Sequence, residues 1–243
     1  MALLADSATA IVDDAVWETI SYLPGRTVGW KRQPEVAEIG AFMASFHEAS
    51  ARSAIEHRVG HNIPISALTV ETTWSDLEVD EQQAGIVRRS IDDLDAGLAR
   101  IDHMAAPLTV IHGDFTNHNV LASGQPSSAS GLIDFSNTYS EAVLADIGFG
   151  LWRSGRPSQQ AHTYDSARLA SILAGYRTTR SVSPDDVDAV IVYLGARGLQ
   201  IAAKQARQGQ TIDGPLVARL RWLHDHADDL RRDVTQRLRQ AVK

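Results

Sequence analysis

The spacing of apolar residues changes along the chain from the period of strands to that of helices. Residues 8–13 and 15–23 are rich in β-branched and aromatic side chains, which predicts a β-hairpin. From Pro34 apolar residues recur at helical spacing, and the same period returns strongly over 79–103. Residues 8–103 therefore predict a small β piece followed by helices.

The middle of the chain predicts two short strands, and the remainder is helical. Leu108–Ile111 and Gly131–Phe135 are apolar strands, and a polar loop, 112–119, follows the first. Ser183 begins a Ser-Pro-Asp-Asp helix start whose helix runs to about residue 208, and a last helix follows Gly214. Strands and helices segregate instead of alternating, which favours a mostly helical α+β fold over a doubly wound parallel sheet.

Composition narrows the function classes. The chain has 243 residues, 44% hydrophobic and 22% charged, with a net charge of −7, which is typical of a globular protein. An acidic balance argues against a nucleic-acid partner, and the absence of cysteine excludes disulfides and zinc–thiolate sites. The sequence shows neither a signal peptide nor an apolar run of about 18 residues. We expect a cytoplasmic protein with no membrane partner.

One segment carries a recognisable chemistry. VIHGDFTNHNVL holds His112, Asp114 and, five residues later, Asn119, and GLIDF ends in Asp134 and Phe135. We expect the two strands to run side by side, so that two carboxylates and one amide converge. Phosphoryl transfer needs such a set, because an aspartate can accept the hydroxyl proton while oxygen ligands hold magnesium. The simpler alternative is that both carboxylates cap turns and that the asparagine is a turn residue.

The pattern H-G-D-x-x-x-x-N, followed by I-D-F, resembles the kinase-fold phosphotransferases of the aminoglycoside phosphotransferase, choline kinase and homoserine kinase type. The resemblance implies a kinase-like C-terminal lobe, with ATP and magnesium as cofactors and a small-molecule hydroxyl as acceptor. It assigns catalysis to Asp114 and magnesium binding to Asn119 and Asp134. His112 would be structural, and Asp146, in ADIGFG, would support the catalytic loop.

The N-terminal part departs from that family. Tyr22 and Leu23, before a Pro-Gly stop, resemble the hinge whose backbone meets adenine, so we expect a residual hairpin and hinge at 1–25 and a catalytic lobe at 26–243. About 20 residues precede the hinge, without the glycine-rich loop or strand lysine of kinases. The chain could be truncated, a natural short form, or a catalytically impaired binding module. A homodimer through the surface that the missing lobe would cover is one option.

The acceptor stays open among an aminoglycoside, an amino alcohol, a sugar and a homoserine-like metabolite. An aminoglycoside would need an acidic pocket, which the net charge permits. The group formed by Trp152, Arg153 and Arg156 could face the acceptor, although a solvated helix end is the simpler interpretation.

Overall fold

A computed structural model describes residues 8–12, 15–19, 24–27, 33–52, 62–70, 74, 81–124 and 128–241. Its elements, with η for 3₁₀ helices, are β1 (Ala8–Val12), β2 (Ala15–Thr19), β3 (Arg26–Thr27), α1 (Gln33–Arg52), η1 (Ile65–Ala67), α2 (Glu81–Arg100), η3 (His103–Ala105), β4 (Leu108–Ile111), β5 (Val120–Ser123), β6 (Ser128–Leu132), η4 (Phe135–Asn137), β7 (Tyr139–Ala142), α3 (Val143–Ser154), α4 (Ser166–Tyr176), α5 (Pro184–Arg207) and α6 (Gly214–Gln240). This order confirms a mostly helical α+β fold.

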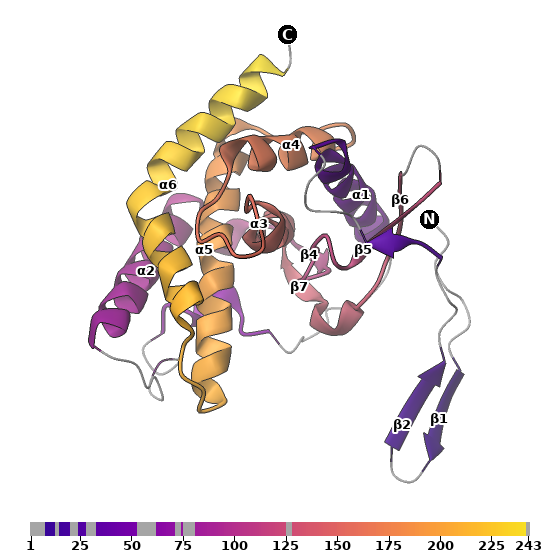
Figure 1. Cartoon of the computed structure of the whole chain (residues 1–243), viewed down its shortest axis with the longest axis horizontal. Coiled ribbons are helices and arrows are strands. Elements are labelled where there is room, and N and C mark those ends of the chain that lie inside the picture. The colour runs from indigo at the N-terminus through magenta and orange to yellow at the C-terminus, as the bar shows by residue number, and fades with distance from the viewer. Residues whose placement is uncertain are drawn as a thin grey trace.

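In the part of the chain that the structure describes, three small antiparallel sheets accompany the helices. β1 pairs with β2 as the predicted hairpin, which extends away from the helical body (Figure 1). β3, β5 and β6 form a second sheet, and β4 pairs with β7 in a third. The expectation that the two motif strands run side by side is therefore wrong, since β4 and β6 belong to different sheets. The partners β5 and β7 have four residues each, too short to show a strand period.

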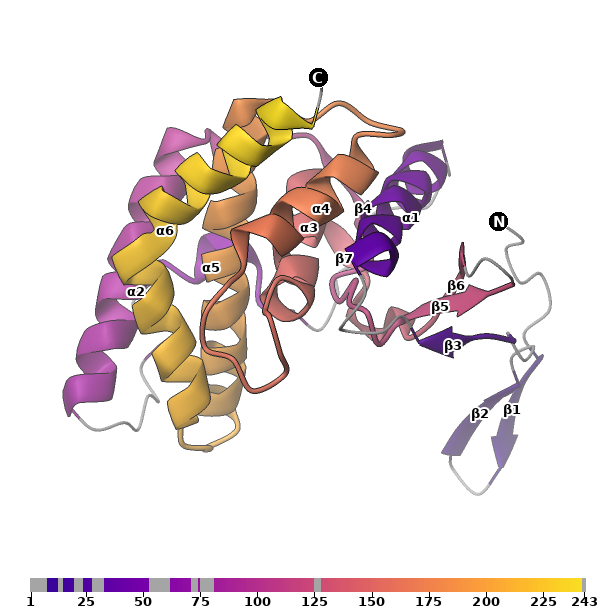
Figure 2. The ribbon, with the colours of Figure 1, turned by 45° about the horizontal axis from the view of Figure 1, so that its top comes forward.

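The helices form the core of the molecule. In Figure 2, α2, α5 and α6 lie together at one side, while the β3–β5–β6 sheet lies at the other, beyond α1. α5 starts as predicted: the Ser183 hydroxyl accepts from Asp186 N at 3.1 Å, and the Asp186 carboxylate accepts from Ser183 N at 2.6 Å. This capping box fixes the start of α5.

α1 and α4 approach each other closely because glycines face the contact. A Cβ atom built on Gly40 would lie 1.8 Å from Ile172 O, and one on Gly175 would lie 1.9 Å from Ala37 O. Only hydrogen fits between these backbones. The contact matters for the site, because α1 carries His47 into the core, where it contacts Asp146.

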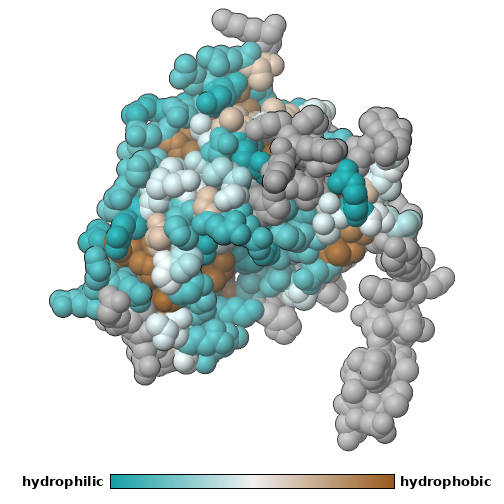
Figure 3. All heavy atoms as spheres, in the orientation of Figure 1, coloured by the Kyte–Doolittle hydropathy of each residue, from teal (hydrophilic) through white to brown (hydrophobic). Residues whose placement is uncertain are grey.

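No described helix is long and apolar enough to cross a bilayer. On the face drawn in Figure 3, hydrophilic residues prevail and hydrophobic ones gather in separate small areas. The homodimer and the division into residues 1–25 and 26–243 stay predictions.

Candidate active site

The loop between β4 and β5 brings Asp114 and Asn119 together. The Asn119 amide nitrogen donates to the backbone oxygen of Asp114 at 2.9 Å and to its Oδ2 atom at 3.1 Å. Thr116 N donates to Asp114 O at 2.8 Å, and Asn119 N donates to Thr116 O at 2.9 Å, which closes the loop. The amide nitrogen, and not the oxygen, faces Asp114. The Asn119 oxygen is thereby left as an acceptor for another group.

Asp134 follows β6 and begins η4 in the left-handed region, at a φ of 63°. The residue before it, Ile133, donates its backbone N–H to Asn119 O at 2.9 Å, so Asp134 and Asn119 lie at one junction. The exposed Asp134 carboxylate accepts from the Ser136 hydroxyl at 2.5 Å and, at 3.4 Å, from Ser136 N. The Oδ1 atom of Asp134 therefore caps the turn, as the simpler alternative predicts, and its Oδ2 atom is available to a ligand.

Asp146 lies behind the loop, fully buried at the start of α3. Its Oδ2 atom accepts from His112 N at 2.9 Å and from His47 Nε2 at 3.0 Å, and its Oδ1 atom accepts from Gly113 N at 2.8 Å. Burial alone would raise the pKa of Asp146, but the hydrogen bonds from His47 and His112 hold it below 3.8. A buried carboxylate thus organises the two residues before Asp114.

The His112 ring links the two halves of the motif. Asp114 N donates to Nδ1 at 3.3 Å, so Nε2 carries the proton and donates to Ile133 O at 3.1 Å. The ring also packs edge-on against Phe115 and Phe135, with centroids 5.7 and 5.0 Å away. Both ring nitrogens are therefore occupied by backbone groups, which favours the predicted structural role over that of a general base.

Gly113 has to be glycine in this loop. Its φ is 75°, and a Cβ atom there would lie 2.2 Å from Asn137 O. Side chains rarely adopt that conformation, and here there is also no space for one. The H-G-D pattern thus has a steric cause.

Arg197 is a site residue that the sequence analysis did not find. Its NH2 group donates to Asp114 Oδ1 at 3.3 Å, and the two side chains are 11% and 24% exposed. Val190 and Leu194, both fully buried, and the partly buried Ile201 lie at helical spacing around it on α5. An arginine within an apolar helix stripe was the available signal, because burying such a charge requires a partner.

A cavity of about 320 Å³ opens on the Arg197 side of Asp114. Trp152 and Arg156 line it and are each 6% exposed, and Arg153 lines it from the end of α3. The interpretation of this group as a solvated helix end is therefore wrong. The periodicity of α3 could not show this, because the residues that cover the group come from α5 and α6.

The donor set fits magnesium better than a transition metal. Among the described residues, no group of three or more His, Cys, Asp or Glu side chains could hold a metal ion. Asn119 and Asp134 offer an amide oxygen and a carboxylate. Magnesium usually takes one or two carboxylates from the protein and completes its shell with phosphate oxygens and water. Tyr22 and Leu23, the predicted hinge, lie outside the described residues.

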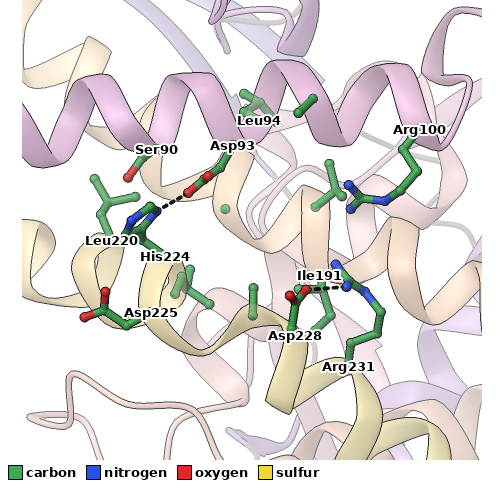
Figure 4. Close-up of a pocket in the computed structure, with 15 residues that line it drawn as sticks. Ser90, Asp93, Leu94, Arg100, Ile191, Leu220, His224, Asp225, Asp228 and Arg231 are labelled. Atoms are coloured by element: carbon green, nitrogen blue, oxygen red, sulfur yellow. Dashed lines mark hydrogen bonds and ion pairs between the residues drawn. The ribbon is translucent and has the colours of Figure 1, made fainter.

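A second hollow lies between α2, α5 and α6 and contains none of the motif residues (Figure 4). There His224 faces Asp93, with 2.6 Å between Nδ1 and Oδ2, and Arg231 NH1 donates to Asp228 at 2.6 Å. Its lining balances arginine against aspartate, and surface ion pairs of this kind contribute little to stability.

Two sequence comparisons find similar proteins. A model of the phosphotransferase enzyme family matches residues 3–182. The homoserine kinase of Sinorhizobium fredii (strain NBRC 101917 / NGR234) is 30% identical over 182 residues, which are 70% of this chain and 50% of that enzyme.

Solved structures share the fold. A microcompartment-associated aminopropanol kinase aligns with a TM-score of 0.65 and 18% identity, over 95% of this chain and 74% of its own. An aminoglycoside phosphotransferase from Alicyclobacillus acidocaldarius subsp. acidocaldarius DSM 446 aligns with a TM-score of 0.61 and 19% identity, over 96% and 74%. The predicted kinase-like fold is confirmed, and the chain spans about half the length of the curated relatives it matches.

Proposed function

The chain belongs to the phosphotransferase enzyme family, and from this premise we propose that it transfers a phosphoryl group from ATP to a hydroxyl of a small molecule. The observation that carries the proposal is the loop junction at which Asp114, Asn119 and the residue before Asp134 are hydrogen-bonded to one another. A supporting carboxylate, Asp146, holds that loop from behind.

Asp114 is proposed as the catalytic residue. Asn119 and Arg197 each donate to a different oxygen of its carboxylate, which fixes its orientation. An ionised carboxylate has about four acceptor positions, so capacity remains for the acceptor hydroxyl. The hydroxyl proton would pass to Asp114, the acceptor oxygen would bond to phosphorus, and the bond from phosphorus to the ADP oxygen would break.

Asn119 and Asp134 are proposed to hold magnesium, and Tyr22 and Leu23 to meet the adenine through their backbone. Magnesium, when bound, offsets the negative charge that develops on the phosphoryl oxygens. Asn119 has a second task in this chain, because its amide nitrogen orients Asp114. The first acceptors to test are those named for the relatives: homoserine, aminopropanol and aminoglycosides.

The proposal is tested by ATP consumption with each acceptor, in wild type, Asp114→Asn and Asp134→Asn. Asp114→Asn should lower kcat by roughly 10²–10⁴-fold, the usual contribution of a proton acceptor. Asp134→Asn should raise the magnesium concentration needed for half-maximal rate. Asp213→Asn, a helix cap of α6, is the matched control and should leave the rate unchanged.

A thermal-shift titration separates the enzyme from the impaired binding module. ATP at about 100 times its Kd stabilises a protein by roughly 2.7 kcal/mol. A shift that requires magnesium and disappears in Asp134→Asn supports the proposed site. Neither a shift nor turnover at millimolar ATP would reject enzymatic activity for this chain and leave a kinase-like binding module.

A further inference from the structure

The cavity beside Asp114 is strongly positive for an acidic protein. Its wall comes from α3 and the turn after it, α5 and α6, and it carries the four guanidinium groups of Arg153, Arg156, Arg197 and Arg219. Of its described lining residues, Asp114 alone bears a carboxylate. The chain as a whole has a net charge of −7, so this local excess of positive charge runs against its composition.

Arg156 is buried in the wall, and Arg153, Arg197 and Arg219 are partly buried. Arg156 is 6% exposed and donates through NH1 to Gln159 O at 2.8 Å. Arg219 stacks on the Trp152 ring, with its CZ atom 5.3 Å from the centroid. Burial lowers the pKa of Arg156, and the charges of Arg219 and Arg153 lower it further. Like charges are thus held together at a cost that an anionic ligand would offset.

The cavity lies apart from the proposed magnesium site. Asp114 meets Asn119 through Oδ2 and Arg197 through Oδ1, and neither Asn119 nor Asp134 lines the cavity. The proposed catalytic carboxylate therefore stands between the expected nucleotide side and the arginine side. A cavity on that side of Asp114 is placed to take an acceptor.

On the basis of the phosphotransferase function proposed above, we propose that the acceptor is a small anionic hydroxy compound. Its carboxylate or phosphate group would bind among Arg153, Arg156 and Arg219, and its hydroxyl would reach Asp114. The volume of about 320 Å³ suits a small molecule, at the lower end of ligand pockets. Guanidinium groups bind carboxylate and phosphate through paired hydrogen bonds, and they repel ammonium groups.

This inference separates the candidate acceptors by charge. A polycationic aminoglycoside or an amino alcohol would place ammonium groups against four arginines. The hollow in Figure 4 shows the contrast, because its arginines lie beside aspartates. The two hollows therefore differ in the balance of charge along their walls.

The test uses probes that differ only in the group opposite the hydroxyl. Hydroxy acids of three to five carbons are compared with the amino alcohols and diols of the same length, with kcat and KM measured for each. The hydroxy acids should have the highest kcat/KM. Arg219→Gln should raise their KM at least tenfold with little change in kcat or in the KM for ATP, and should leave the diols unaffected.

Arg221→Gln is the matched control. Arg221 is exposed on the same helix as Arg219, and its substitution removes the same charge. Binding is also measured by calorimetry in Asp114→Asn without ATP, a readout that needs no turnover. If hydroxy acids bind, if Arg219→Gln abolishes this binding and if wild type transfers no phosphoryl group, the anion site is supported and the proposed enzyme function is rejected.

Four results would overturn the inference. These are a preference for amino alcohols or diols, equal KM values in the two arginine variants, a rise in the KM for ATP instead of the acceptor, and failure of every hydroxy acid to bind. The third result would place nucleotide phosphate, and not an acceptor, in the cavity.

Discussion

Replacing Asp146 by asparagine should destabilise the protein strongly although the side chain keeps its shape. Three donors converge on the carboxylate: His112 N and His47 Nε2 on Oδ2, and Gly113 N on Oδ1. An asparagine has a single oxygen. In either orientation its NH₂ group must face at least one of these donors, and the residue is 0% exposed, so water cannot compensate.

The magnitude follows from the least damaging orientation of the amide. With its oxygen at the Oδ2 position, only the bond from Gly113 is lost. A hydrogen bond to a charged group contributes about 1.5–3 kcal/mol, and a buried unsatisfied donor costs about 1–3 kcal/mol more. We expect a loss of about 3–5 kcal/mol, which also matches the usual cost of breaking a buried ion pair. The midpoint of thermal unfolding should fall by about 10 °C.

Urea denaturation at pH 7, followed by circular dichroism, measures the loss. Asp213→Asn makes the same chemical change at the cap of α6, where Leu216 N donates to the side chain at 2.5 Å. Asparagine caps helices about as well as aspartate, so this control should change stability by less than about 0.5 kcal/mol. Hydrogen exchange adds a local readout, because the amides of His112 and Gly113 should exchange faster in Asp146→Asn alone.

The reasoning fails if Asp146→Asn costs less than about 1 kcal/mol, or no more than Asp213→Asn. Either result would mean that the backbone holds the 112–119 loop without the carboxylate. Unchanged exchange at His112 and Gly113, together with a large loss of stability, would place the effect elsewhere in the core.

Three further predictions follow from the packing and the charges. Gly113→Ala should lower kcat roughly tenfold or more in steady-state assays, because its Cβ would lie 2.2 Å from a carbonyl oxygen of η4. Gly40→Ala should lower the free energy of unfolding by about 2–3 kcal/mol in urea denaturation. Gly195→Ala should raise it by about 0.5–1 kcal/mol, because no atom lies within 4 Å of the added Cβ. Burial alone would raise the pKa of Asp188, but two arginines lower it below 3.8. Its contribution to stability is therefore complete above that pH and is lost as the pH falls through the lowered pKa. The free energy of unfolding of wild type should exceed that of Asp188→Asn by about 1 kcal/mol. This difference should stay constant from pH 7 to 5 and disappear below about pH 3.8.

Local signals predicted local structure. Ser183 with its Pro-Asp-Asp start predicts the beginning of α5, and the structure has the full capping box there. The H-G-D-x-x-x-x-N spacing predicts that Asp114 and Asn119 lie together, because one closed loop contains both. The position of Asp134 could not be predicted in this way, because the strand before it, β6, pairs with β5 and not with β4. Asp134 reaches the junction through the bond from Ile133 to Asn119.

The sequence could not predict the contacts between side chains that lie far apart along the chain. Asp114 and Arg197 are 83 positions apart, and His47 and Asp146 are 99 apart. No period or motif links such pairs, and net charge conceals them, because a chain with seven excess negative charges still gathers four arginines around one cavity. A charge count averages over the surface, whereas recognition depends on the few groups that line one hollow. Acceptor preference in this chain should therefore follow the charge of the cavity wall and not that of the whole protein.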